Sequence, residues 1–180
     1  MRTGLIVAFA AVMAFAVTAN ANFTVKSPTL SNGGVIPNKH VFNGYGYNGD
    51  NVSPALSWSE APAGTKSFAI TVYDPDAPHP GGWWHWLVFD IPAQVIGLAE
   101  NAASGVGLPP SAVQSVTDFR TTGYGGPCPP PGKPHHYVFT VYALKVARLD
   151  AKPTDPPAKV DNEIRRQSLA HASIVASFGK

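Results

Sequence analysis

The sequence predicts a mainly β protein, in which two antiparallel sheets form a sandwich and one helix lies near the C-terminus. Three segments, residues 68–74, 83–91 and 135–143, carry apolar side chains at alternate positions, as strands with one buried face do. The 180 residues include 17 glycines and 18 prolines, which is typical of a sandwich with rigid loops. Because 44% of the residues are hydrophobic, we expect a single globular domain over residues 22–180.

The first 21 residues are predicted to be a cleaved secretory signal. Arg2 precedes an apolar run at residues 5–17, and residues 19–21 read Ala-Asn-Ala, the small-x-small form of a signal-peptidase site. The run is too short for a comfortable membrane span, and no other apolar stretch approaches one. We therefore expect a periplasmic or secreted protein that begins at Asn22 and has no transmembrane segment.

Weaker patterns indicate the remaining strands. Residues 23–30 are predicted to form the first strand, residues 55–58 a short one and residues 115–120 another. Glycines between residues 44 and 49 mark turns, and residues 98–110 are expected to be irregular.

The predicted helix follows a proline-rich linker at residues 152–157. Asp161 is expected to cap its first turn. The stripe expected to pack against the sandwich consists of Val160, Ile164, His171 and Val175. His171 is therefore interpreted as a partly buried structural histidine.

Polar side chains stand at the ends of the three alternating segments. The first apolar face ends in Asp74, and the third begins with His135 and Tyr137. Alternation places five side chains of the second segment on one face, namely Trp83, His85, Leu87, Phe89 and Ile91. If these strands run antiparallel, the polar ends gather at one edge of the hydrophobic core, and the sequence predicts a pocket there.

Several classes of function are disfavoured. The 13 basic residues fall to 12 when Arg2 is removed with the signal, against 11 acidic residues, so the mature charge is near +1. No run of Lys and Arg could neutralise a phosphate backbone, which argues against nucleic acid as a partner.

His136 alternates away from His135 and no HxH or HExxH spacing occurs, so no metal or other cofactor is expected. A hydrolase using an Asp–His pair stays open as an alternative, but no GxSxG motif accompanies the pair and we expect no enzyme.

Motifs in these segments resemble those of the phosphatidylethanolamine-binding protein family, also called the Raf-kinase-inhibitor-like family. The motifs are Asn51-x-Ser53-Pro54-x-Leu56-x-Trp58, Asp74-Pro75-Asp76-Ala77-Pro78, Trp83-x-His85 and Gly126-Pro127…Gly132…His135-x-Tyr137. Together with the predicted signal, the sequence Gly-Trp-Trp-His-Trp resembles an exported bacterial branch of the family. A departure is His136, where many members carry arginine.

The resemblance implies a two-sheet antiparallel β fold with a small anion-binding pocket at one end. The residues that match the pocket lining of the family are Asp74, Asp76, Trp83, His85, Gly126, His135 and Tyr137. Imidazoles, a phenol and glycine N–H groups are donors that suit phosphate oxygens, and we expect His85 and His135 to donate to a phosphate. The face of Trp83 suits an ammonium group.

We therefore expect an exported, non-catalytic binding protein for phosphate-bearing or zwitterionic small molecules, including phospholipid headgroups. A second reading is an interaction module with a vestigial pocket, whose real partner is another protein. Cys128 is the single cysteine, so no intramolecular disulfide can form. It either packs in its loop or bridges two chains of a homodimer.

The predicted signal can be tested directly. The mature protein should begin at Asn22, because small residues occupy the positions that a signal peptidase requires. N-terminal sequencing of protein from the extracytoplasmic fraction measures this, and a chain there that still begins at Met1 would contradict the assignment.

Overall fold

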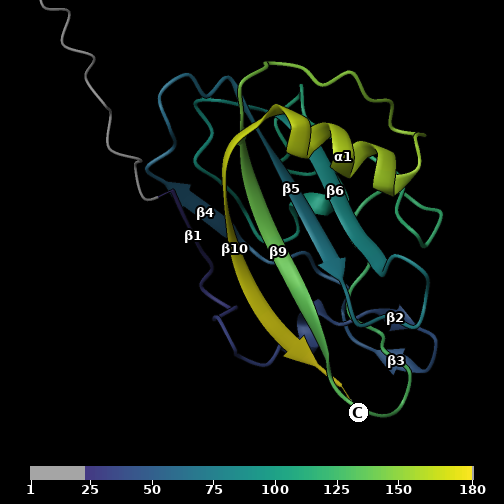
Figure 1. The fold of residues 1–180 in the computed structure, drawn as a ribbon. Helices are drawn as coiled ribbons and strands as arrows, with labels where there is room; N and C mark the ends of the chain where they lie inside the picture. The colour runs from purple at the N-terminus through teal and green to yellow at the C-terminus, as the bar shows by residue number, and fades with distance from the viewer. Residues whose placement is uncertain (1–22, 180) are drawn as a thin grey trace, which may run out of the picture.

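A five-stranded antiparallel sheet is the largest element of the computed structural model, which describes residues 23–179. Its strands, in spatial order, are β10 (Ser168–Phe178), β9 (His135–Leu144), β5 (Ser67–Asp74), β6 (Trp83–Pro92) and β8 (Val113–Gln114) (Figure 1). The three alternating segments therefore form the three central strands of one sheet. The predicted signal at residues 1–21 lies outside the described residues.

A smaller sheet completes the sandwich. Its strands, in spatial order, are β1 (Thr24–Lys26), β4 (Leu56–Ser59) and β7 (Gly97–Leu98). The main hydrophobic core joins the two sheets, and Trp58 of β4 lies against Phe68 of β5 with 5.2 Å between ring centroids. The short hairpin β2 (Asn43–Gly44) and β3 (Tyr47–Asn48) and the 3-10 turns Asn38–His40 and Ala102–Ser104 lie in the loops. The predicted mainly β, antiparallel sandwich is confirmed.

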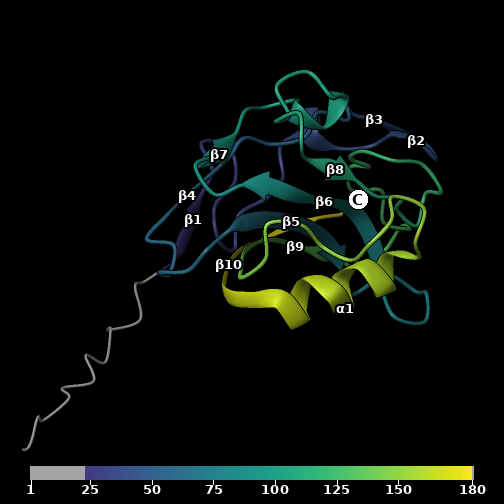
Figure 2. The same cartoon turned by 90° about the horizontal axis from the view of Figure 1, so that it is seen from above.

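Helix α1 (Pro157–Gln167) covers the outer face of the larger sheet (Figure 2). Val160 and Ile164 are fully buried there, in a second hydrophobic cluster with Leu87 and Phe89 of β6. Because the apolar side chains of α1 lie on one face of the helix, α1 buries the outer face of the larger sheet, whose inner face is buried by the core. Among the described residues, no helix has the length and apolar character needed to cross a bilayer.

The predicted helix is shorter than expected and its second half is a strand. His171 and Val175, expected on the helical stripe, lie on β10, where they pair with Tyr142 and Val138 of β9. The open edge of β9 supplies a complete ladder of backbone hydrogen bonds, and this ladder outweighs the weak helical periodicity of the segment. Asp161 is not the cap, because Pro156 occupies that position and Asp161 accepts a hydrogen bond from Arg165 inside the helix at 2.6 Å.

Strand β6 contains a bulge at His85. Val72 of β5 pairs with Trp86, whereas Tyr73 pairs with Trp84, so His85 is an extra residue in the ladder. A bulge shifts the alternation of side chains by one position. His85 therefore faces the side of the sheet that holds the pocket, and so does Trp86, which belongs to the core between the sheets.

A second irregularity lies near Asp90, whose φ is 57°. Between the two irregularities Leu87 and Phe89 face α1, whereas Val88 faces the core between the sheets. The prediction that Leu87 and Phe89 share a face with His85 is therefore wrong. The extra residue at His85 produces the difference, because it moves the following side chains to the opposite face, and the second irregularity then returns Ile91 to the core between the sheets.

Three loop predictions also differ from the structure. The first strand covers only β1, within the predicted residues 23–30. No strand lies within the predicted residues 115–120, because β8 ends at Gln114. The segment forms an isolated bridge at Val116 and a tight turn, in which Thr117 donates from its backbone N and its Oγ1 to the carbonyl of Thr121. Residues 98–110, expected to be irregular, include the end of β7 and a 3-10 turn.

Ile164 and His171 offer a matched test of the corrected C-terminal region. Ile164→Ala should lower the free energy of unfolding by about 2–5 kcal/mol, because it opens a cavity beneath α1. His171→Ala should change it by less than about 0.5 kcal/mol, because His171 is exposed on β10. Urea unfolding of the two variants measures both changes. Equal losses would contradict the exposed position of His171 on β10.

Candidate functional site

A cavity of about 200 Å³ opens where β5 ends and where β6 and β9 begin. Five of the residues predicted from the sequence line it, namely Asp74, Trp83, His85, His135 and Tyr137. The antiparallel pairing of β5 with both neighbours brings these three strand ends together. Asp76 and Gly126, also predicted for the pocket, are not part of its lining.

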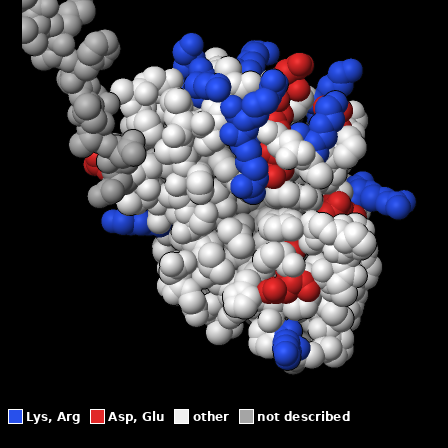
Figure 3. Space-filling model, in the orientation of Figure 1, with Lys and Arg blue, Asp and Glu red and all other residues white. Residues whose placement is uncertain are grey.

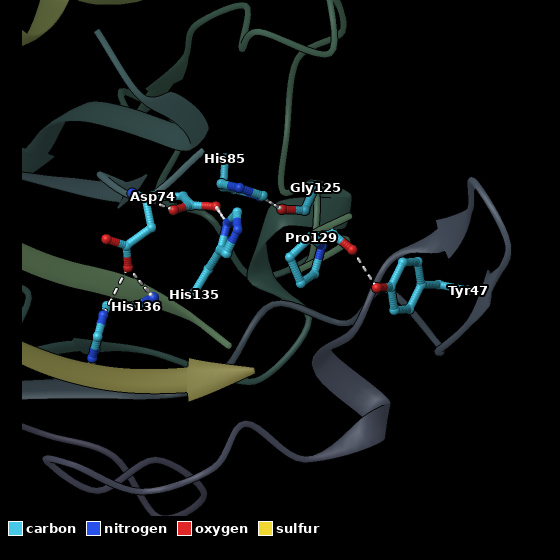
Figure 4. Close-up of polar contacts among 8 residues, drawn as sticks. Tyr47, Asp74, His85, Gly125, Pro129, His135 and His136 are labelled. Atoms are coloured by element: carbon cyan, nitrogen blue, oxygen red, sulfur yellow. Dashed lines mark hydrogen bonds and ion pairs between the residues drawn. The ribbon is translucent and has the colours of Figure 1, made fainter. Parts of the chain in front are cut away.

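Asp74 and His135, which both line the cavity, form a buried pair (Figure 4). His135 Nδ1 lies 2.8 Å from Asp74 Oδ2, and the backbone N–H of Asp76 donates to Asp74 Oδ1 at 2.8 Å. Both carboxylate oxygens are therefore occupied by the protein itself. The carboxylate holds the ring of His135 in one orientation and leaves its Nε2 available to a ligand.

His85 is held by a backbone carbonyl rather than by a carboxylate. Its Nδ1 lies 2.7 Å from the carbonyl oxygen of Gly125, and the backbone N–H of Gly125 donates to the carbonyl of His85 at 2.9 Å (Figure 4). Burial lowers the pKa of His85 to about 4, while hydrogen bonding to Gly125 and Gly126 and the charge of Asp74 oppose the shift only in part. His85 is therefore neutral at physiological pH.

Two buried donors in the lining have no hydrogen-bond partner within residues 23–179. They are the hydroxyl of Tyr137 and the indole Nε1–H of Trp83. Burial raises the pKa of Tyr137 above its ordinary value, so the hydroxyl stays protonated. Such orphaned donors are rare in proteins, because each costs about 1–3 kcal/mol when it is desolvated without a partner.

The walls of the cavity come from loops that the sequence analysis did not select. Phe119 lies edge-on to His85 and to Trp83, with ring centroids 5.3 Å and 5.5 Å apart. Tyr45 lies at the mouth, 76% exposed, and stacks on Phe119 at 6.4 Å. The glycines on both sides of Tyr45 mark a turn in the sequence, but nothing there indicates that this turn reaches the pocket.

Proline residues and Cys128 form another side of the cavity. Burial raises the pKa of the Cys128 thiol to about 11, so the thiol remains protonated at neutral pH. Its position in the pocket wall agrees with the packing role that the sequence left open.

Asp76 lies outside the cavity and fastens the loop after β5. Its Oδ2 accepts hydrogen bonds from the backbone N of His136 at 2.8 Å and from His136 Nδ1 at 2.7 Å (Figure 4). These bonds lower the pKa of Asp76. His136 is exposed while its neighbours His135 and Tyr137 are buried, so the prediction that His136 faces away from the pocket is confirmed.

Gly126 supports the pocket from behind. Its backbone N–H donates to Asn51 Oδ1 at 2.7 Å and is therefore already occupied, while Asn51 Nδ2 donates to the carbonyl of Tyr124 at 3.1 Å. A Cβ at Gly126 would lie only 2.2 Å from the carbonyl oxygen of His40. Glycine is thus needed here for a close approach of two backbones, and Asn51 of the upstream motif holds the same segment.

The electrostatics of the site rest on few groups. Among the described residues, no Lys or Arg lines the cavity; its polar groups include the paired side chains of Asp74 and His135, a neutral His85 and a protonated Cys128 thiol. The described part of the chain also contains no cluster of three or more His, Cys, Asp or Glu suited to a metal ion. The arrangement can bind a small polar group through neutral donors and one His–Asp pair.

Comparison with known proteins gives consistent matches across almost the whole described chain. The model of the family described as phosphatidylethanolamine-binding protein matches residues 26–179. The UPF0098 protein YbhB of Escherichia coli is 49% identical over 153 residues, covering 84% of this chain and 97% of the relative. The UPF0098 protein YbcL of the same organism is 45% identical over 181 residues, covering 99% and 98%.

Solved structures agree with the sequence matches. The crystal structure of E. coli YbcL, described as a new member of the mammalian PEBP family, superimposes with a TM-score of 0.86 and covers 89% of this chain and 99% of its own. A phosphatidylethanolamine-binding protein homolog from Chlamydia trachomatis superimposes with a TM-score of 0.73 at 31% identity, covering 90% and 99%. The motifs, the sandwich and these matches lead to one conclusion: this chain belongs to the phosphatidylethanolamine-binding protein family.

Proposed function

We propose that this protein is an exported, non-catalytic binding protein whose pocket takes a small phosphate-bearing headgroup. The observation that carries the proposal is the pair of orphaned donors, Tyr137 Oη–H and Trp83 Nε1–H, in the lining of one cavity. A ligand rich in acceptor oxygens would pair both donors and recover the cost of their desolvation. His135 adds a donor when it is protonated, already oriented by Asp74.

The size of the cavity supports a headgroup rather than a whole lipid. About 200 Å³ lies below the usual range for sites that hold drug-sized ligands, roughly 300–1,000 Å³. Pro78, Pro129 and Pro130 give the cavity stiff, apolar walls, and the face of Trp83 is available to an ammonium group or to short carbon chains. Phosphoethanolamine has the phosphate, the short carbon chain and the ammonium group that these features suit.

The donor set also supports binding without catalysis. No Ser or Thr lines the cavity within the described residues, and burial raises the pKa values of the Tyr137 hydroxyl and the Cys128 thiol. A protonated thiol and a protonated phenol are weak nucleophiles at neutral pH. These two protonated groups beside the Asp74–His135 pair therefore favour binding over the hydrolase alternative.

The surface gives no support to a polyanionic partner on the face shown in Figure 3. Basic side chains there lie mostly around α1, interleaved with acidic ones. Three ion pairs involve this helix: Lys159–Asp155 at 3.0 Å, Arg165–Asp161 at 2.6 Å and Arg166–Glu163 at 2.5 Å. Paired charges of this kind keep the helix in water and do not form a basic patch.

His135 and His136 allow a matched test, because they are adjacent in sequence and face opposite sides. His135→Gln should weaken the binding of phosphoethanolamine by about ten- to a hundredfold, since a charge-assisted hydrogen bond contributes about 1.5–3 kcal/mol. His136→Gln should leave the affinity within about twofold, because its ring bonds Asp76 outside the cavity. Isothermal titration calorimetry measures both, and equal losses would contradict the proposed site.

The variant Tyr137→Phe tests whether the hydroxyl of Tyr137 binds the ligand or stabilises the fold. The variant removes only a hydroxyl that has no partner, so the free energy of unfolding should stay equal or rise by about 1 kcal/mol. The affinity for phosphoethanolamine should fall about fivefold to tenfold, because one hydrogen bond to the ligand is lost. Thermal unfolding and calorimetry test the two halves. A destabilised variant with unchanged affinity would assign the hydroxyl to the fold instead.

A further inference from the structure

A second cavity, of about 400 Å³, shares a single lining residue, Trp83, with the headgroup pocket. Its volume falls within the usual range for sites that hold small molecules, roughly 300–1,000 Å³. The rest of its lining consists of His79, Val116, Thr117, Asp118, Arg120 and Pro157. The second cavity therefore has its own set of charged, polar and apolar side chains.

One tight turn supplies both charged residues of the second cavity. Thr117 Oγ1 donates to the carbonyl of Thr121 at 3.0 Å, and the backbone N–H of Arg120 donates to the carbonyl of Thr117 at 2.9 Å. Asp118 is fastened to β6, because its backbone N–H donates to the carbonyl of Trp84 at 3.2 Å and its Oδ2 accepts the backbone N–H of Trp84 at 2.7 Å. These bonds hold the turn in a fixed position at the wall of the cavity.

The charged groups on this turn are not neutralised by the protein. Within residues 23–179, Asp118 Oδ1 accepts no hydrogen bond, and the guanidinium of Arg120 has no hydrogen bond or ion pair. The two groups therefore do not pair with each other. His79 Nδ1 lies 3.2 Å from the carbonyl oxygen of Gly82, which only accepts, so the neutral ring keeps Nε2 as an acceptor. One cavity thus combines a free cation with free acceptors.

The backbone of Arg120 is strained. Its φ of 62° lies in the left-handed region, which disfavours residues that carry a Cβ. The side chain is exposed, so burial does not hold it in place. Residues in such conformations gather at ligand sites, where function offsets the strain. An arginine that is strained, unpaired and part of a cavity lining therefore indicates a ligand for its guanidinium.

We propose that this second cavity binds an α-amino acid with an apolar side chain, its carboxylate on Arg120 and its ammonium on Asp118 Oδ1. The planar guanidinium matches a carboxylate through two parallel hydrogen bonds. One cation and one carboxylate balance a ligand that carries one charge of each sign, whereas Asp118 would repel a phosphate dianion. Val116 and Pro157 give the apolar side chain of the ligand a surface to pack against.

Titration of L-leucine into the intact protein tests the proposal, with two analogues that each lack one charge. Leucinamide has no carboxylate, and 4-methylpentanoate has no ammonium group. Each should bind at least about tenfold more weakly than leucine, because a charge-assisted hydrogen bond is lost. Calorimetry measures the affinities, and the NMR shifts of the backbone amides of residues 116–120 locate the site.

Arg120→Gly separates a ligand contact from a structural role. The variant removes the cation and relieves the strain, so leucine binding should be lost while the melting temperature stays equal or rises. Glu60→Gly is the matched control, because Glu60 is exposed, has a φ of 61° and does not line this cavity. Its leucine affinity should stay within about twofold of the original. Asp118→Asn should weaken leucine binding about tenfold or more.

The outcomes also separate this cavity from the headgroup pocket. His135→Gln should weaken phosphoethanolamine binding and leave leucine binding within about twofold, because His135 does not line the second cavity. Loss of leucine binding in His135→Gln with retention in Arg120→Gly would place leucine in the headgroup pocket and overturn the inference. Absence of leucine binding up to about 10 mM, or equal affinities for leucine and both analogues, would overturn it as well.

Discussion

The antiparallel pairing of β5 with β6 on one side and β9 on the other is the constraint on which the site depends. Because both neighbours run opposite to β5, its last residue lies beside the first residues of both. Asp74 pairs with Trp83, and Tyr73 lies opposite Val138, one residue beyond Tyr137. A polar group at the end of one strand thereby meets polar groups at the start of two others, at the edge of a core that is otherwise apolar.

Alternation was enough to predict the sandwich and five pocket residues, but it failed where both faces of a strand are buried. In β6, Trp84, Trp86, Leu87, Val88 and Phe89 are all buried, so the sequence is a continuous apolar run and the extra residue at His85 leaves no gap in the pattern. The strand β10 was mistaken for helix because its small residues fit both periods. Tyr45 and Phe119 reach the pocket from separate loops, and this convergence is a tertiary property that no local pattern contains.

The motif residues divide into those that line the cavity and those that hold its frame. Asp74 takes part in both, since it orients His135 and accepts the backbone N–H of Asp76. Asp76 fastens the loop to β9 through His136, and Gly126 and Asn51 join the segment behind His85 to the 3-10 turn region. Residues that share one motif therefore have different physical tasks, and a motif match alone does not distinguish a ligand contact from a support.

The position of β10 has a consequence for the order of events during synthesis. This last strand pairs with β9 along its whole length, and it also bonds residues near the start of the domain: Gly33 and Ile36 donate to the carbonyls of Val175 and Ser177. Contacts this distant in sequence close late, because the intervening chain must first be ordered. The sandwich therefore cannot be completed until β10 has left the ribosome. Such late closure is compatible with the export that we propose, because a translocation channel threads an unfolded chain.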